Sequence, residues 1–221
     1  MLLDADFRYI NEEFYAYTVS PTQIDFLLAN GWRHFGTHFF RYNLGVYEDE
    51  VRRVIPLRIN IGNFRPSKSQ RRVLRKNWDL KVQIQPARID DEVHNLFESH
   101  KARFKSGVPE SIHDFLSSRP ADLPNRTWEI EVRLENRLVA ASFFDVGTTS
   151  VSSVYAVFDP AEKSRSLGIF TLLKEIEYAV HAGKQFCYQG YSYEGNSFYD
   201  YKKLFAGNEE FDWNGNWRLV G

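Results

Sequence analysis

The C-terminal two thirds of the chain alternates between segments with a strand pattern and segments with a helical pattern. Residues 128–134 alternate apolar and polar side chains, as half-buried strands do, and residues 138–146 and 150–157 follow as further strands. Residues 167–181 form an amphipathic helical pattern that ends at Gly183. A short strand at residues 186–188 then enters a loop over residues 190–195.

The N-terminal part carries the same two patterns in shorter pieces. Residues 21–31 predict a helix that Thr22 caps and Gly31 ends, and residues 66–77 predict a second helix with Pro66 in its first turn. Helical spacing recurs over residues 91–104, and another helix begins at residue 112 with Ser111 as its cap. Strands are expected at residues 35–44, 54–61 and 80–85.

This order of elements predicts an α/β protein of the α+β kind, with helices layered on a mostly antiparallel sheet. We expect two parts, a small N-terminal region over residues 1–78 that ends in the second helix, and a larger domain over residues 79–221. A chain of 221 residues with 43% hydrophobic content is long enough for a well-buried core.

Composition narrows the function classes. The chain has one cysteine, Cys187, so it lacks both an internal disulfide framework and a thiolate metal site. Cys187 lies in an apolar run, which favours a buried small side chain over a nucleophile. No segment approaches the ~20 apolar residues of a membrane span, and the first residues lack the pattern of a secretory signal. We therefore expect a cytoplasmic protein that does not enter a membrane.

Positive charge is concentrated in one segment although the net charge is only −1. Residues 51–76 contain no acidic residue, and on the predicted helix Lys68, Arg71, Arg72 and Arg75 recur at spacings of three and four, next to Arg65. Such a face is suited to the phosphates of a nucleic acid, whose binding then weakens steeply with salt. The alternative is an ordinary solvated helix face, which usually mixes both signs of charge.

Two further segments are candidates for chemistry. Arg165 and Gly168 stand at the start of the helix over residues 167–181, where backbone N–H groups favour an anion, although a plain helix start capped by Ser164 or Ser166 has the same pattern. Residues 190–194 and the tyrosines and lysines at 199–203 are suited to stacking on a base, or simply to packing. The six histidines are scattered and form no triad or metal motif.

Residues 64–77 read FRPSKSQRRVLRKN and resemble the FRPSxSQRRxxRxN signature of arginyl- and leucyl-tRNA–protein transferases. Weaker motifs of that family follow in the same order over about residues 25–205: PLR at 56–58, SVY at 153–155, FDP at 158–160, RSLG at 165–168, GY at 190–191 and YK at 201–202. The resemblance implies a GNAT-like acyltransferase domain that moves an amino acid from charged tRNA to the N-terminal amine of a protein in the N-degron pathway. It also implies a cysteine cluster linked to metal before the PLR segment, but residues 41–54 contain no cysteine, so we expect no metal cofactor.

On this reading the partners are an aminoacyl-tRNA and an acceptor protein or peptide. The basic helix, Arg165 and Gly168 would hold tRNA, and Tyr155 and Asp159 would lie at the reacting centre, where Asp159 accepts or orients the amine proton. Tyr191 would line the aminoacyl pocket, and Arg58 or Lys202 would pair with an acidic first residue of the acceptor. Two alternatives remain open: an acyl-CoA-dependent GNAT N-acyltransferase, and a tRNA-binding homologue without catalysis. The oligomeric state and the transferred amino acid are not predicted.

Overall fold

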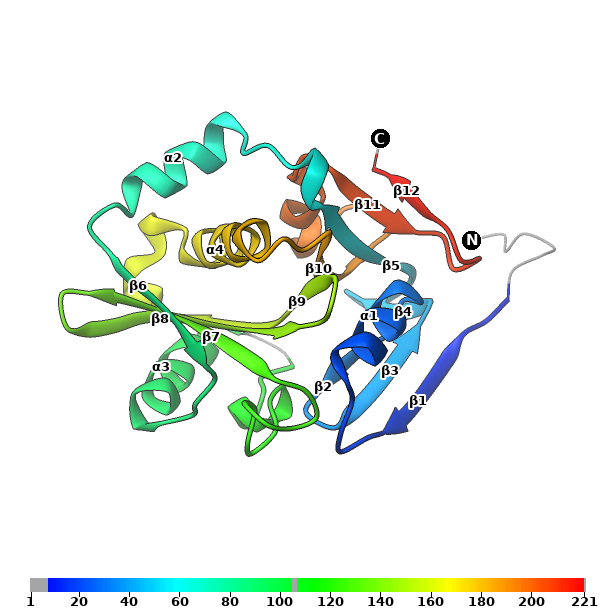
Figure 1. Ribbon diagram of the computed structural model, residues 1–221, viewed down its shortest axis with the longest axis horizontal. Helices are drawn as coiled ribbons and strands as arrows, with labels where there is room; N and C mark the ends of the chain where they lie inside the picture. The colour runs from blue at the N-terminus through cyan, green and yellow to red at the C-terminus, as the bar shows by residue number, and fades with distance from the viewer. Residues whose placement is uncertain (1–7, 105–106, 221) are drawn as a thin grey trace.

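A long, twisted sheet forms the centre of the computed structural model, which describes residues 8–104 and 107–220 (Figure 1). Its strands run in the order β12-β11-β5-β10-β9-β8-β7-β6, and β4 pairs with β5. All neighbouring pairs are antiparallel except β9 with β10. The bounds are β4 Leu44–Tyr47, β5 Glu50–Asn60, β6 Lys81–Pro86, β7 Thr127–Leu134, β8 Arg137–Val146, β9 Ser150–Phe158, β10 Phe186–Tyr193, β11 Asn208–Phe211 and β12 Trp217–Leu219.

Helices cover both faces of this sheet (Figure 1). Helix α4 (Leu167–His181) lies on one face with α2 (Lys68–Lys76) outside it, and α3 (Asp91–Lys101) lies on the other. The core under α4 contains Ile130, Phe144 and Ile176, whereas Phe97 and Phe143 belong to the core under α3. The apolar sides that the sequence predicts for α3 and α4 therefore each pack against one face of the sheet. In the described part of the chain there are also four short 3₁₀ segments: η1 Ile61–Asn63, η2 Ile112–Asp114, η3 Pro160–Arg165 and η4 Phe198–Leu204.

A smaller sheet in the order β1-β3-β2 lies beside the main one with α1 (Pro21–Ala29) packed on it (Figure 1). Its strands are β1 Asn11–Tyr15, β2 Arg33–Phe35 and β3 His38–Tyr42. Ile24, Leu28 and Phe39 form a separate core with Tyr188 of β10. Strand β5, from the N-terminal region, lies between β10 and β11 in the large sheet, so residues on both sides of position 78 share that sheet. The division at residue 78 stays a prediction.

Several local predictions need correction. Ser20, not Thr22, caps α1, since its side chain accepts from the Gln23 backbone in a reciprocal capping box. Ser67 caps α2 in the same way, which places Pro66 before the cap rather than in the first turn. Ser166 precedes α4 in a left-handed conformation and makes no side-chain cap.

Two predicted elements differ in kind. Residues 190–193 continue strand β10 instead of forming a loop, because β5 pairs with them. The helix expected from residue 112 is only the 3₁₀ turn η2, although Ser111 does cap it.

Strands β9 and β10 run parallel for three pairs only and then diverge. The last pair joins Tyr188 to Ser152, after which β10 has a bulge before Gly190, whose φ is +89°. A positive φ of this kind is easy for glycine and strained for other residues. The bulge and the positive φ turn β10 away from β9, and the sheet opens between them.

None of the helices in residues 8–104 and 107–220 combines the length and the apolar character that a membrane span requires.

Candidate active site and nucleic-acid interface

The outer face of α2 presents the predicted cations to solvent. Arg65, Lys68, Arg71, Arg72 and Arg75 are all exposed. Among residues 8–104 and 107–220, none of the five forms an ion pair with a carboxylate; Arg65 and Arg71 donate only to nearby backbone carbonyls. Five like charges within the nine residues of α2 repel one another, and no acid on the same helix offsets them. The exposed cationic face of α2 is therefore free to bind an external polyanion.

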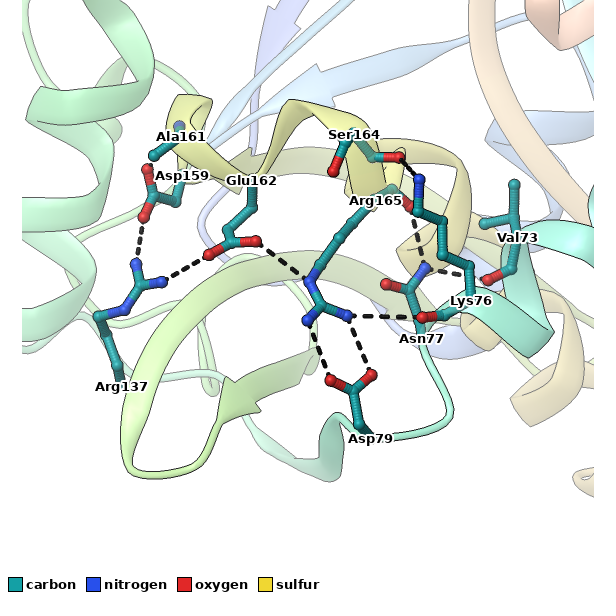
Figure 2. A network of polar contacts seen from close by, with 10 residues as sticks. All are labelled: Val73, Lys76, Asn77, Asp79, Arg137, Asp159, Ala161, Glu162, Ser164 and Arg165. Carbon is teal, nitrogen blue, oxygen red and sulfur yellow. Dashed lines mark hydrogen bonds and ion pairs between the residues drawn. The ribbon is translucent and has the colours of Figure 1, made fainter.

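The other end of α2 is fixed to the turn before α4, as Figure 2 shows. Lys76 Nζ donates to the Ser164 carbonyl at 2.5 Å, and Asn77 Nδ2 donates to the Arg165 carbonyl at 2.9 Å. Val73 and Leu74 pack on the core beneath. These contacts hold the cationic face in one orientation relative to the sheet.

Arg165 and Asp159 lie in a chain of ion pairs in the same region (Figure 2). Arg165 donates to both carboxylate oxygens of Asp79 at 2.9 Å and to Glu162 at 3.1 Å. Arg137 joins Glu162 at 2.7 Å to Asp159, which also accepts from the Ala161 backbone as the cap of η3. Both residues therefore have partners within the fold, and their predicted roles toward tRNA and the amine stay predictions.

The opening between β9 and β10 is filled by two cations from distant segments. Arg33 of β2 donates to Ser152 Oγ at 2.6 Å and to the Ser153 carbonyl, which β10 no longer approaches. Lys202 of η4 donates to the Tyr191 carbonyl at 3.1 Å. A Cβ atom on Gly190 would lie 3.4 Å from Lys202 Nζ and 3.6 Å from an Arg33 nitrogen. Both cations thus meet at the point where the strands separate.

Burial makes this point electrostatically unusual. Arg33 is only 8% exposed, Lys202 is half-buried, and neither has a carboxylate partner among the described residues. Burial and, next, the Arg33 charge lower the pKa of Lys202 to about 7. Glu175 of α4 lies in the same region, and burial raises its pKa to about 8, so it is largely protonated at neutral pH. Neither Arg33 nor Lys202 forms a direct ion pair among the described residues, and the buried Asp145 carboxylate only partly offsets the lowering of the Arg33 pKa by burial.

Several buried polar atoms on the elements that border the opening have no hydrogen-bond partner. They are Tyr155 Oη on β9, Glu175 Oε2 on α4, and Gln189 Oε1 and Ser192 Oγ on β10. An unpaired buried polar atom is costly, and it is usually retained where a ligand or water completes the bonding. Four of the six unpaired buried atoms in the described residues thus lie on β9, β10 and α4, which makes the opening the candidate binding site.

Aromatic rings surround the outer edge of the opening. Tyr155 stacks on Phe115 at a centroid distance of 3.7 Å, and burial raises its pKa to about 12. Arg103, just after α3, lies over Phe158 at 4.8 Å and interacts with the Tyr155 and Tyr201 hydroxyls electrostatically. Of the predicted site residues, Tyr155 and Lys202 are thus brought to the same opening.

Three predicted residues lie elsewhere or are enclosed. Tyr191 directs its hydroxyl to the Gly31 carbonyl at 2.6 Å, on the side of the small sheet. Arg58 pairs with Glu209 at 2.6 Å between the rings of Phe186 and Trp217. Gly168 lies directly under Phe158, where a Cβ would meet the ring at 3.2 Å.

The sequence interpretation missed Arg33, Arg103 and Glu175. Glu175 had a detectable signal, because it occupies a position on α4 where the helical spacing of Leu172, Ile176 and Ala179 calls for an apolar side chain. Arg33 and Arg103 follow helices and have no signal in the spacing. Residues 41–54 form the end of β3, strand β4 and the start of β5, and no cluster of three metal-ligating side chains occurs in the part of the chain that the structure describes.

An α+β sheet that opens at a parallel pair, beside an exposed cationic helix, has the architecture expected of an acyltransferase whose substrate carries phosphates. Residues 4–72 match the family described as "Arginine-tRNA-protein transferase, N terminus", and residues 91–212 match its "C terminus" counterpart. The chain belongs to this family. The predictions of the family and of an aminoacyltransferase are confirmed.

Individual relatives agree. The aspartate/glutamate leucyltransferase of Marinobacter nauticus is 31% identical over 195 residues, which cover 87% of this chain and 80% of the relative. FemX superposes with a TM-score of 0.52 at 10% identity, covering 91% of this chain and 71% of that one. The C-terminal DUF2156 domain of a protein assigned as a lysylphosphatidylglycerol synthetase from Agrobacterium fabrum gives 0.50 at 15% identity, covering 84% and 56%. The two structures show a shared fold, and the predicted α+β class with a mostly antiparallel sheet is confirmed.

Proposed function

We propose that this protein transfers leucine from leucyl-tRNA to the N-terminal amine of proteins whose first residue is aspartate or glutamate. The choice of leucine and of acidic acceptors rests on the name of the relatives that align over most of their length. The observation that carries the proposal is the exposed cationic face of α2, whose charges have no carboxylate partners among the described residues and can therefore meet tRNA phosphates.

The reaction is the aminolysis of an ester. The acceptor amine, once deprotonated, attacks the aminoacyl carbonyl, and the 3′-terminal ribose oxygen leaves and takes up a proton. Because the ester is already activated, orientation and proton handling account for most of the required rate enhancement. The opening between β9 and β10 is the proposed place of attack.

Among the candidate catalytic residues, Tyr155 is better placed than Asp159. Its hydroxyl is buried and has no protein partner, so it is available to donate to the ester carbonyl or the departing oxygen. Asp159 pairs with Arg137 and caps η3, so we propose that it positions the turn before α4. Tyr191 is proposed to support the wall of the site, because its hydroxyl is used by the Gly31 carbonyl.

The roles of the cations follow from their partners. Arg65, Lys68, Arg71, Arg72 and Arg75 are proposed to contact phosphates, while Arg165, which pairs with Asp79, is proposed to fix the end of α2 near Gly168. We assign the acceptor carboxylate to Lys202 rather than Arg58, because Glu209 already neutralises Arg58. Since charged tRNA is a cytoplasmic substrate, we also propose that the protein acts in the cytoplasm.

The test is a transfer assay with purified protein, tRNAs charged with radiolabelled leucine, arginine or phenylalanine, and peptides that differ only in their first residue. We expect label in peptides that begin with Asp or Glu, and only from leucyl-tRNA. The absence of transfer from all three tRNAs would refute the proposal. A thermal shift with acetyl-CoA that tRNA does not produce would favour an acyl-CoA-dependent enzyme instead.

A further inference from the structure

Arg33 and Lys202 each make structural hydrogen bonds at the opening of the sheet, and most of their N–H donors remain unused. Arg33 replaces the missing ladder bond at the Ser153 carbonyl of β9, and Lys202 does the same at the Tyr191 carbonyl of β10. Pro56 faces Tyr191 across the β5 pairing and has no N–H to offer. An ammonium group has three donors and a guanidinium five, so each cation retains donors for a ligand.

The ligand expected at this point is anionic. With a pKa of about 7, Lys202 is protonated in only part of the molecules at neutral pH, and a bound anion would hold it in the charged form. Two cations that are removed from water without a carboxylate partner are costly, and a single bound anion would offset both. Glu175 does not supply it, because its Oε1 accepts from Ser142 at 2.8 Å and burial keeps it largely protonated. The Asp145 carboxylate acts on Arg33 only without direct contact, because its oxygens bond to His34 and Thr127. The space beside Gly190, which lacks a side chain, lies within 4 Å of both cations.

Three parts of the proposed substrates could lie beside Arg33 and Lys202: the leucyl side chain, the tRNA phosphates, and the side-chain carboxylate of the acceptor. A leucyl side chain is apolar and gains nothing beside two buried charges. The tRNA phosphates are strongly hydrated and repeat along a chain, which suits the exposed row on α2 rather than a half-buried point. A side-chain carboxylate at the acceptor N-terminus is small, singly charged and only a few bonds from the reacting amine.

We infer that Arg33 and Lys202 form a carboxylate pocket that recognises the side chain of the first acceptor residue, with Gly190 leaving the room for it. This inference rests on the proposed function and adds its specificity determinant. The carboxylate accepts from the Lys202 ammonium and the free edge of the Arg33 guanidinium, and the amine of the same residue then lies at the opening between β9 and β10. Charge-assisted bonds of this kind select Asp over the isosteric Asn.

The experiment measures peptide binding directly, so that it does not depend on transfer. Isothermal titration compares peptides that begin with Asp or Asn and are otherwise identical. In the wild-type protein we expect the Asp peptide to bind at least about ten-fold more tightly, the size of one charge-assisted hydrogen bond. Lys202→Met should remove most of this preference by weakening the Asp peptide alone.

The matched control is Lys203→Met. Lys203 is the next residue on η4, but it donates to the Tyr193 and Gly195 carbonyls and pairs with Asp200, away from Gly190. This variant should keep the wild-type Asp/Asn ratio. Arg33→Lys keeps a positive charge but loses the second arm of the guanidinium, so it should give an intermediate ratio.

The outcomes separate the two proposals. An unchanged Asp/Asn ratio in Lys202→Met, with the fold intact by circular dichroism, overturns the pocket even if leucine transfer proceeds normally. A wild-type protein that discriminates Asp from Asn in binding but transfers no amino acid supports the pocket and refutes the proposed reaction. Equal binding of both peptides by the wild type also overturns the pocket.

Discussion

The guanidinium of Arg165 and the carboxylate of Asp79 meet in two parallel hydrogen bonds of 2.9 Å each, although the residues are 86 positions apart in the chain (Figure 2). Asp79 follows the end of α2, and Arg165 ends the turn that leads into α4. This fork, together with Lys76 and Asn77, attaches the cationic helix to the edge of the acyl-transfer domain. The positions of α2 and of the turn before α4 are thereby coupled.

The first prediction concerns this fork. Asp79→Ala and Arg165→Ala should each lower the free energy of unfolding slightly, and a double-mutant cycle should give a small favourable coupling, because solvent screens this exposed pair. Urea unfolding followed by fluorescence measures it. Both variants should weaken tRNA binding to the same extent, because both remove the ion pair that connects α2 to the turn before α4. A loss of binding in Arg165→Ala alone would show that Arg165 contacts tRNA directly.

The second prediction concerns the exposed row on α2. Replacing Lys68, Arg72 and Arg75 together by Gln should weaken tRNA binding and flatten its dependence on salt, with the slope of log K against log salt falling by about two to three. Gln maintains helix propensity, so circular dichroism should not change. Arg119→Gln, an exposed arginine in the segment after η2, serves as the control. Unchanged affinity in the triple variant would contradict tRNA binding by this face.

The third prediction concerns the unpaired hydroxyl of Tyr155. Tyr155→Phe removes an atom that has no protein partner, so the melting temperature should stay equal or rise slightly. Transfer should nevertheless fall by about ten-fold or more in kcat if the hydroxyl donates to the ester. Single-turnover kinetics with leucyl-tRNA measures the chemical step. Normal kcat in this variant would remove Tyr155 from the mechanism.

The fourth prediction concerns the pH dependence of stability. Burial raises the pKa of Glu175 from its ordinary 4.5 to about 8, so the folded protein holds this proton more tightly than the unfolded chain. The contribution is complete below about pH 4.5 and is lost as the pH rises toward 8, by at most about 1.4 kcal/mol per unit. Glu175→Gln should therefore gain stability relative to wild type between pH 5 and pH 8.

Melting temperatures across that pH range give the measurement. Glu177→Gln, a change on the exposed side of the same helix, is the control and should follow the wild-type profile. A constant difference between Glu175→Gln and the wild type at all pH values would show that Glu175 does not titrate in this window.

The fifth prediction separates two roles for Asp159. If its carboxylate positions η3 through Arg137, then Asp159→Asn and Arg137→Gln should reduce transfer by similar factors. If it handles the amine proton, only Asp159→Asn should impair transfer, and the pH profile of kcat should shift. Rates measured from pH 6 to pH 9 distinguish these results, and full transfer by Asp159→Asn would remove it from both roles.

Local patterns in the sequence were sufficient for most of the helices and strands. The helical spacing over residues 167–181 gave the bounds of α4, and the acid-free stretch before residue 77 gave the cationic face of α2. The chemistry of the opening was only half visible, because Lys202 belongs to a recognisable motif while Arg33 lies 169 positions away on another sheet. No spacing rule connects two residues that meet only when β2 and η4 converge on β10.

By itself, the sequence determined the kinds of elements, the family and the cationic segment, since periodicity, capping and local charge act between residues a few positions apart. The tertiary structure alone decided which cations remain free. It neutralised Arg58 and Arg165 with Glu209 and Asp79, and it brought Arg33 and Lys202 together without an ion-paired carboxylate in the described residues. The availability of a charge depends on its three-dimensional neighbours and its exposure to water, and neither is encoded in local spacing.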